Sequence, residues 1–277
     1  MTNWKHLGYL AILTILLASC GRSLRPAATS DLYRQITYRN LQTTSFFDSP
    51  QKISIAEIPE VLPGNEQWGV AYATDTLIRT SDFAQNERAL VAINGGFFNM
   101  QEGGSVTYLE VDGQVINFTV NEAERWAKDS PVVKGALIVT GENELRIEPN
   151  RRADYYQRSP NERAVLITGP LLLQKGRRVA LGTSDFINKR HPRSCVCTTT
   201  DQRILLVAVD GRNADAAGMS LPELQEFLLL QNCREAINLD GGGSTALWMA
   251  GRGIINSPSD KTGERPVANI LYLNREK

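Results

Sequence analysis

The sequence predicts a single α+β domain built on a large mixed or antiparallel β-sheet with a few helices. Short strand-like runs recur along the whole chain, whereas signals for helices are few. Strands and helices do not alternate strictly, which argues against a doubly wound parallel sheet. The chain has 277 residues, of which 42% are hydrophobic and 22% charged, as is typical of a globular protein.

The expected strands are runs of aliphatic and β-branched residues separated by turn residues. The run 89–93 is apolar throughout, which indicates a buried strand. In chain order the expected strands are 52–58, 67–73, 89–93, 106–111, 114–120, 135–140, 144–148, 164–168, 204–210, 236–239 and 267–273.

The clearest helix signal is a capping box at Ser220, with Glu223 three residues later and a proline in the first turn. It predicts a helix through residue 231. Ser81 is expected to cap a short helix that ends near residue 87, and the segment 154–157 is ambiguous. If the strands before and after the 221–231 helix run parallel, the residues that follow each strand will meet at one edge of the sheet.

The first residues have the pattern of a secretory signal, with a basic start, an apolar stretch at 7–18 and small residues before Cys20. Leu17-Ala18-Ser19-Cys20 resembles the lipobox of bacterial lipoproteins, so we expect Cys20 to carry lipid. Gly21 follows it, and by resemblance to Gram-negative lipoproteins this favours sorting to the outer membrane, facing the periplasm or the exterior, if the source has one. The expected organisation is a signal peptide at 1–20, a tether at 21–31 and one domain at 32–277.

Charge and cysteine content restrict the function classes. Lysine and arginine number 30, as do aspartate and glutamate, so no global positive field favours nucleic acid.

Apart from Cys20, the chain contains Cys195, Cys197 and Cys233, which suggests one disulfide and a free thiol. A bridge from one of the first two to Cys233 is an open alternative. With His191 the only histidine outside the signal, no structural zinc site is expected.

Three apolar runs each end in a polar residue and glycine. They are followed by Asn94-Gly95-Gly96, by Asp210-Gly211-Arg212 and by Asp240-Gly241-Gly242-Gly243-Ser244. Glycine lets backbone approach a ligand closely, at a cost of roughly 0.5–1 kcal/mol each relative to alanine. Although such dipeptides are common in turns, three of them after strands indicate a binding site at strand ends.

Six motifs occur in the order seen in one family, and together the chain resembles the phosphodiester glycosidase family over about residues 90–273. The motifs are Asn94-Gly95-Gly96-Phe97-Phe98, Gly169-Pro170-x-Leu172, Arg190-His191-Pro192-Arg193-Ser194, Asp210-Gly211-Arg212 with Gly218-x-Ser220-x-x-Glu223-Leu224, Asn238-Leu239-Asp240-Gly241-Gly242-Gly243-Ser244-Thr245, and Glu264-Arg265-x-Val267. The resemblance implies hydrolysis of the bond between the anomeric carbon of a sugar and a phosphodiester oxygen.

That reaction requires a carboxylate to stabilise an oxocarbenium-like transition state and to direct water or a nucleophile. Asp240 is the first candidate for nucleophile or base, and Asp210 and Glu264 compete for a second carboxylate role. The departing phosphate requires cations, and the planar guanidinium binds it bidentately. The expected substrate-binding residues are Asn94, Gly95, Gly96, Arg193, Arg212, Asn238, Gly241, Gly242, Gly243, Ser244 and Arg265.

Three alternatives stay open at this stage. The same pocket could bind cell-envelope glycan without catalysis, as a lipid-anchored module. No cofactor is expected, although Asp210 and Asp240 offer oxygen ligands suited to Ca²⁺ or Mg²⁺. Ser49-Pro50-Gln51-Lys52 fits the S-x-x-K motif of penicillin-binding proteins, but Lys52 begins a strand-like run rather than a helix. The sugar, the stereochemical outcome and the oligomeric state are not specified by the sequence.

Overall fold

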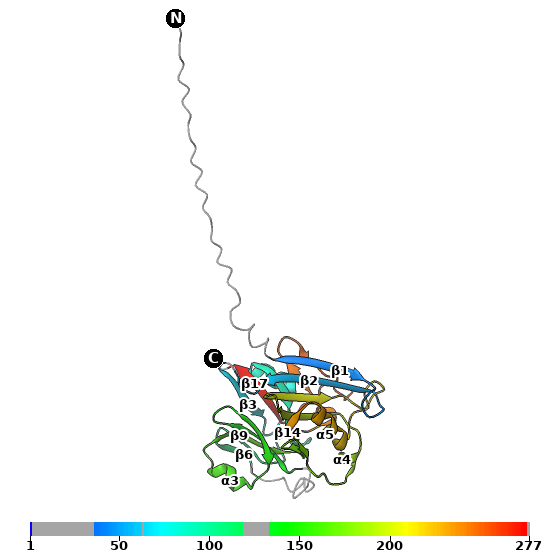
Figure 1. Cartoon of the computed structure of the whole chain (residues 1–277). Coiled ribbons are helices and arrows are strands. Elements are labelled where there is room, and N and C mark those ends of the chain that lie inside the picture. Colours follow the sequence, from blue (N-terminus) through cyan, green and yellow to red (C-terminus); the bar gives the residue numbers. More distant parts are fainter. Residues whose placement is uncertain (2–35, 63, 119–132, 276–277) are drawn as a thin grey trace.

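The computed structural model describes Met1 and residues 36–62, 64–118 and 133–275, which form three antiparallel sheets with short helices around them (Figure 1). The fold is therefore α+β, as predicted, although the strands divide among three sheets rather than one. The expected signal peptide, Cys20 and the tether fall on residues 2–35, outside the described part. Within the described part, no helix combines the length and apolar character needed to cross a membrane.

The first sheet has seven strands, and its central strands bring the candidate site residues together. Their order is β1 (Thr37–Thr43), β2 (Gln51–Pro59), β13 (Arg203–Val209), β12 (Arg193–Thr199), β14 (Cys233–Asn238), β10 (Leu171–Gln174) and β11 (Arg177–Arg178). Because β12 pairs antiparallel with both β13 and β14, these two strands run parallel to each other. The expected parallel arrangement is confirmed, with β12 between the two strands.

The second and third sheets have five strands each. The second contains β16 (Gly253–Ile254), β15 (Leu247–Met249), β4 (Ala89–Asn94), β17 (Asn269–Arg275) and β3 (Glu66–Tyr72). The third contains β6 (Gln114–Asn117), β5 (Leu109–Val111), β9 (Glu162–Thr168), β7 (Gly135–Thr140) and β8 (Leu145–Pro149). The strand expected from residue 106 starts later, at Leu109, and the part of the expected 114–120 strand after residue 118 lies outside the described residues.

A central core joins the three sheets. Leu206 and Ile237 of the first sheet pack there with Ile93 of the second and Leu137 of the third. Along β13 alternate residues face opposite ways, and Leu205 and Val207 lie instead in a second cluster beneath α5 (Leu221–Leu230). Both faces of β13 are therefore buried, which explains the continuous apolar run in the sequence.

The helices cover the outer faces of the sheets (Figure 1). Helix α5 buries Leu224 and Phe227 against the first sheet, and α4 (Asp185–Asn188) lies next to it. Phe83 of α2 (Thr80–Asn86) packs on the second sheet, and Tyr156 of α3 (Ala153–Arg158) packs on the third. The ambiguous 154–157 segment is thus helical.

One helix start is predicted correctly and one is not. At α5, Ser220 Oγ accepts the Glu223 N–H and the Glu223 carboxylate accepts the Ser220 N–H, so the capping box is complete. Ser81 does not cap α2. The N-cap position is Arg79, and Ser81 lies inside the first turn, where its N–H donates to Glu264.

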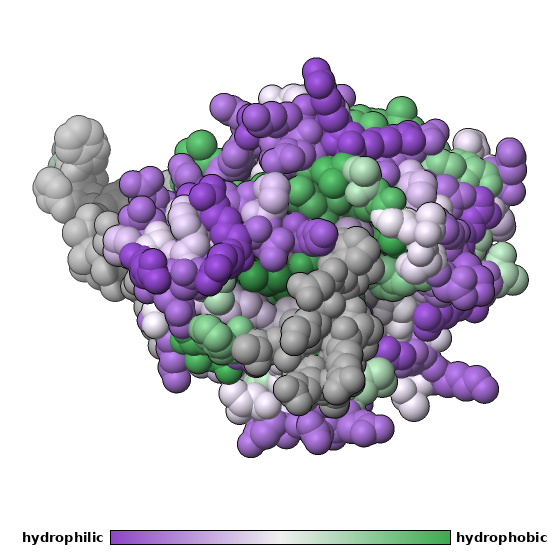
Figure 2. Space-filling model, turned by 90° about the horizontal axis from the view of Figure 1, so that it is seen from below, coloured by the Kyte–Doolittle hydropathy of each residue, from purple (hydrophilic) through white to green (hydrophobic). Residues whose placement is uncertain are grey.

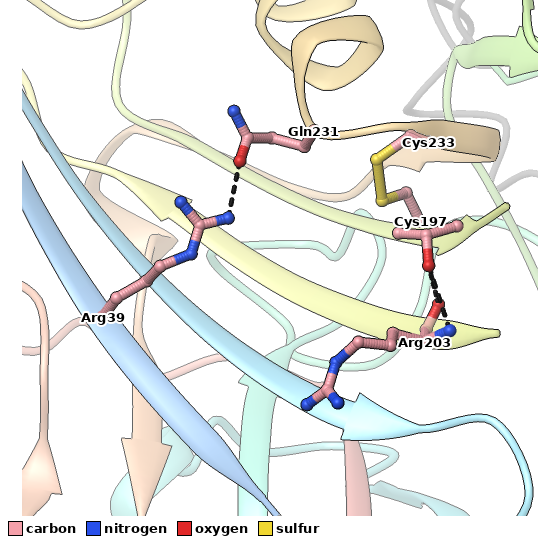
Figure 3. The surroundings of a disulfide bond; sticks show 6 residues. Arg39, Cys197, Arg203, Gln231 and Cys233 are labelled. Carbon is pink, nitrogen blue, oxygen red and sulfur yellow. Dashed lines mark hydrogen bonds between the residues drawn. A yellow bond between two sulfur atoms is a disulfide. The ribbon is translucent and has the colours of Figure 1, made fainter. Parts of the chain in front are cut away.

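A disulfide joins Cys197 of β12 to Cys233 at the start of β14, with a Cα–Cα distance of 5.8 Å (Figure 3). Cys195 is a buried free thiol. One bridge and one free cysteine are therefore found among the three candidates. On the same side of the sheet, Arg39 of β1 donates to Gln231 at the end of α5.

The surface seen from below is mainly hydrophilic, with hydrophobic residues between the polar ones (Figure 2). The large hydrophobic side chains exposed in the described part come from separate elements, among them Val61, Met100, Tyr155 and Leu230. Such isolated exposure is common in proteins and indicates no particular function.

The capping box gives a first testable prediction. Ser220→Ala should lower the free energy of unfolding by about 1 kcal/mol, because the Glu223 N–H loses its acceptor. Chemical denaturation measures the change. Ser81→Ala, which removes no capping bond, serves as the control and should change stability by less than about 0.5 kcal/mol. Equal losses in the two variants would contradict the assignment.

Candidate active site

The segment from Asp240 to Thr245 follows β14 and forms a turn that contains a 3₁₀ helix (Gly242–Ser244). We call residues 240–245 the glycine turn. Backbone hydrogen bonds join it to two other strand ends: the Asp240 N–H donates to Gly95 O at 2.9 Å, and the Gly242 N–H donates to Pro192 O at 2.9 Å. The ends of β14 and β4 and the start of β12 therefore meet at one place, and the first two are ends of apolar runs singled out in the sequence.

Glycine is required in the turn for two distinct reasons. Gly242 has a φ of +63°, a conformation that L side chains rarely adopt, and a Cβ there would lie 3.0 Å from Nη2 of Arg212. A Cβ on Gly243 would overlap the guanidinium of Arg265 and the carboxylate of Asp260. The missing side chains thus allow two arginines to lie directly against the turn.

Asp240 is a carboxylate whose pKa is raised by loss of solvation. Its side chain is partly exposed, and loss of solvation raises its pKa to about 6, while Ser244, the Gly241 N–H and Arg265 lower it. A carboxylate with this pKa changes its charge near neutral pH.

The two asparagines expected to bind sugar are both fully buried and bind the protein instead. Asn94 donates to the carbonyl oxygen of Asp240 at 2.7 Å and accepts from Ser194 Oγ at 2.6 Å and from Ala246 N at 3.1 Å. Asn238 donates to the carbonyl oxygens of Gly169 and Leu239. Asn94 thus holds the backbone of Asp240, and Asn238 holds the backbone just before the glycine turn.

Gly95 and Gly96 are held in a similar way by Asn269, at the start of β17. The Gly95 N–H donates to the backbone oxygen of Asn269, and the Gly96 N–H donates to its side-chain Oδ1. A Cβ on Gly95 would overlap that Oδ1. Sequence reasoning missed Asn269, since an asparagine before an apolar run gives no distinct signal.

Arg193 is almost completely buried, with 1% of its surface exposed. Its guanidinium donates to the carbonyl oxygens of Met219, Phe186 and Lys189 at 2.7–3.0 Å. Burial and the charge of Arg212 lower the pKa of Arg193 to about 9. These bonds link α4 and Met219 to β12. Arg193 therefore supports the loops around the site from inside the fold.

Arg212 and Arg265 lie at the glycine turn, in different environments. Arg265 forms a bidentate ion pair with Asp260, at 2.7 and 3.0 Å, and both side chains are about one quarter exposed. Arg212 is exposed and has a φ of +64°, which is unusual for a residue other than glycine. Sequence reasoning missed Asp260, because an acid in a turn is common and gives no specific signal.

The two candidates for a second carboxylate have other partners. Asp210 is 1% exposed, its Oδ1 accepts from Asn256 and Ser257, and burial raises its pKa. Glu264 accepts the Ser81 N–H at 2.7 Å, in the first turn of α2. Both therefore bind backbone or amide groups of the fold, and Asp240 is the partly exposed carboxylate of the glycine turn.

Metal binding and the penicillin-binding motif receive no support. Within the ranges that the structure covers, no group of three or more His, Cys, Asp or Glu side chains is placed to hold a metal. Lys52 of the S-x-x-K motif lies on strand β2 rather than on a helix.

A groove of about 1020 Å³ lies between Leu62, Asn143 and Thr199, and no residue of the glycine turn lines it.

Comparison with known proteins identifies relatives of this chain. A family model described as phosphodiester glycosidase matches residues 87–274. The chain is 26% identical over 194 residues to the SPbeta prophage-derived uncharacterized protein YomE of Bacillus subtilis, covering 69% of this chain and 29% of that protein. It is 27% identical over 180 residues to mouse N-acetylglucosamine-1-phosphodiester alpha-N-acetylglucosaminidase, covering 61% of this chain and 33% of the mouse protein. The chain thus corresponds to about a third of the length of these relatives.

A solved structure has the same fold. The catalytic domain of zebrafish N-acetylglucosamine-1-phosphodiester alpha-N-acetylglucosaminidase, auto-inhibited by its pro-peptide, superposes with a TM-score of 0.70 at 21% identity. The match covers 87% of this chain and 83% of the zebrafish chain. This share of the chain is longer than residues 87–274. The structural match therefore also includes residues before 87, where the sequence contains none of the six motifs.

The raised pKa of Asp240 predicts a pH-dependent cost in stability. Below about pH 4 the carboxyl is protonated in both the folded and unfolded states; between about pH 4 and 6 the unfolded state ionises first, so stability falls. Asp240→Asn should therefore unfold with a free energy about 1–3 kcal/mol larger than the parent chain at pH 8, and with an equal one below pH 4.

Denaturant titrations at several pH values measure this difference. Asp215→Asn, at an exposed aspartate of the neighbouring loop, is the matched control and should show no pH-dependent change. A less stable Asp240→Asn protein at pH 8 would contradict the electrostatic description of the site.

Proposed function

The chain belongs to the phosphodiester glycosidase family, and from this premise we propose that it hydrolyses the anomeric bond of a sugar-1-phosphodiester, with Asp240 as the catalytic carboxylate. The observation that carries the proposal is the position of Asp240: a partly exposed acid with a pKa of about 6, in a glycine turn that two guanidinium groups contact. N-acetylglucosamine, named in the mouse and zebrafish relatives, is the first sugar to test.

In the proposed reaction, the bond between the anomeric carbon and the phosphate oxygen breaks, and its electron pair leaves with the phosphate. A water oxygen bonds to the anomeric carbon and its proton passes to a base, which gives a free sugar and a phosphate monoester. Asp240 acts as that base, or as a nucleophile on the anomeric carbon, and either role requires the ionised carboxylate. Its pKa keeps it ionised at neutral pH.

A phosphate monoester is a good leaving group, so the reaction requires less acid assistance than an ordinary glycoside does. This fits a site in which Asp210 and Glu264 bind the fold. The charge on the departing phosphate requires a cation instead, and the accessible guanidinium groups at the turn are Arg212, which is exposed, and Arg265, which is paired with Asp260. Buried Arg193 contributes by positioning the backbone near it.

The proposal predicts the effect of Asp240→Asn on catalysis. Turnover of a sugar-1-phosphodiester should fall about 1000-fold, because the group that must be ionised is lost. In the parent chain kcat/KM should rise with pH through a midpoint near 6. Release of sugar from a panel of sugar-1-phosphodiesters measures both.

Two controls accompany this test. Asp215→Asn removes an exposed carboxylate and should keep full activity, and His191→Gln should keep the rise near pH 6 if Asp240 causes it. A parent chain that binds the sugar phosphodiester but releases no sugar would favour the non-catalytic glycan-binding alternative.

We also propose that the chain is lipid-anchored through Cys20 in the cell envelope, since Leu17-Ala18-Ser19-Cys20 fits a lipobox. Cys20→Ser should move the expressed chain from the membrane fraction to the soluble fraction of a bacterial host. Fractionation with metabolic labelling by palmitate measures this, with Cys195→Ser as the control because Cys195 is buried. An unlabelled parent chain would contradict the anchor.

A further inference from the structure

The two guanidinium groups at the glycine turn contact different glycines. Nη2 of Arg212 lies 3.0 Å from the position of a Cβ on Gly242, and the Arg265 guanidinium lies against Gly243. The arginines come from distant segments, since Arg212 follows β13 and Arg265 precedes β17. They therefore mark two parts of the site. The Arg212 part lies at Gly242, and the Arg265–Asp260 part lies at Gly243.

The net charge of these two parts differs. Both oxygens of Asp260 accept from Arg265, so that pair is close to neutral while it offers hydrogen-bond donors and acceptors. For Arg212, the described part of the chain supplies no carboxylate within ion-pair distance. The uncompensated positive charge thus lies on the Arg212 part of the site.

A second guanidinium, that of Arg193, lies close enough to Arg212 to repel it. Burial, Arg193 and Arg212 lower the pKa of His191, and Arg212 adds to the effect of burial on Arg193. The nearby acids have cations of their own, since Glu223 pairs with Arg190 and Asp185 pairs with Lys189. A ligand anion would compensate these like charges, which repel one another in its absence.

Building on the proposed function, we propose that the substrate lies across the glycine turn in one direction, with its phosphate on the Arg212 part and its sugar on the Arg265–Asp260 part. Arg212 then determines the preference for an aglycone that carries phosphate. The neutral ion pair suits sugar hydroxyls, because it both donates and accepts hydrogen bonds. Asp240 lies in the same turn, where the anomeric carbon joins the two halves of the substrate.

The first experiment uses inorganic phosphate as the probe and does not require turnover. Binding to the full-length chain in detergent is measured by calorimetry or by phosphorus NMR for the parent, Arg212→Asn and Arg265→Gln. Asparagine tolerates the positive φ of residue 212 and leaves the backbone unstrained. We expect phosphate affinity to fall at least tenfold in Arg212→Asn and less than threefold in Arg265→Gln, with Arg212→Lys close to the parent.

The control variant is Arg178→Ala, at an exposed arginine on β11, which should bind phosphate as the parent does. Circular dichroism and thermal unfolding establish that each variant is folded. Greater dependence on Arg265 than on Arg212, or no phosphate binding to the folded parent at 50 mM phosphate, overturns the orientation.

The second experiment compares kcat/KM for a sugar-1-phosphodiester with kcat/KM for an aryl glycoside of the same sugar. Arg212→Asn should reduce this ratio about 100-fold, whereas Arg265→Gln should change it less than fivefold, because both substrates contain the sugar. An unchanged ratio in an active Arg212→Asn protein overturns the orientation. A parent chain that binds phosphate through Arg212 but hydrolyses neither substrate overturns the proposed function and leaves the assignment of the phosphate to Arg212 standing.

Discussion

The site depends on one buried amide, the side chain of Asn94. Located at the end of β4 in the second sheet, it donates to the backbone of Asp240 and accepts from Ser194 and Ala246. Ser194 belongs to β12 of the first sheet, so a single side chain joins the two sheets where the catalytic candidate leaves β14. A buried amide that satisfies these partners fixes their relative positions, because leaving any of them unpaired would cost about 1–3 kcal/mol.

With the glycine turn held from behind, the groups on its accessible side are arranged by charge. Glycine at position 243 leaves the space that the guanidinium of Arg265 fills, and glycine at position 242 allows a positive φ beside Arg212. Asp240 has lost solvation there, yet the ionised form is supported by Ser244, the Gly241 N–H and Arg265. Together these effects leave Asp240 with a raised pKa. Its ionisation lowers the free energy of unfolding, and its pKa suits proton transfer near neutral pH, as is common at functional sites.

Much of the fold, and the strand ends that meet at the candidate site, were predictable from sequence, because they depend on local patterns. The capping box at Ser220, the apolar run of β13 and the polar residues after each strand are such patterns. The roles of single polar residues could not be predicted. They depend on which backbone carbonyl groups lie near each side chain in the folded protein and need a hydrogen-bond donor. Arg193 satisfies three of these, and Asn238 satisfies two, so both lie inside although their residue types suit a ligand. Asp260 and Asn269 act through partners on other segments and gave no local signal.

The disulfide between Cys197 and Cys233 spans 36 residues of sequence, and closing a loop of that size restricts the unfolded chain by about 4 kcal/mol. The closed loop contains β13, Arg212 and the whole of α5, while Asp240 lies outside it, beyond the end of β14. Oxidation of the two thiols therefore closes the segment that carries Arg212 into a covalent ring. Because Cys233 begins β14, which pairs with β12 and leads to Asp240, the same covalent link anchors the strand from which the carboxylate emerges.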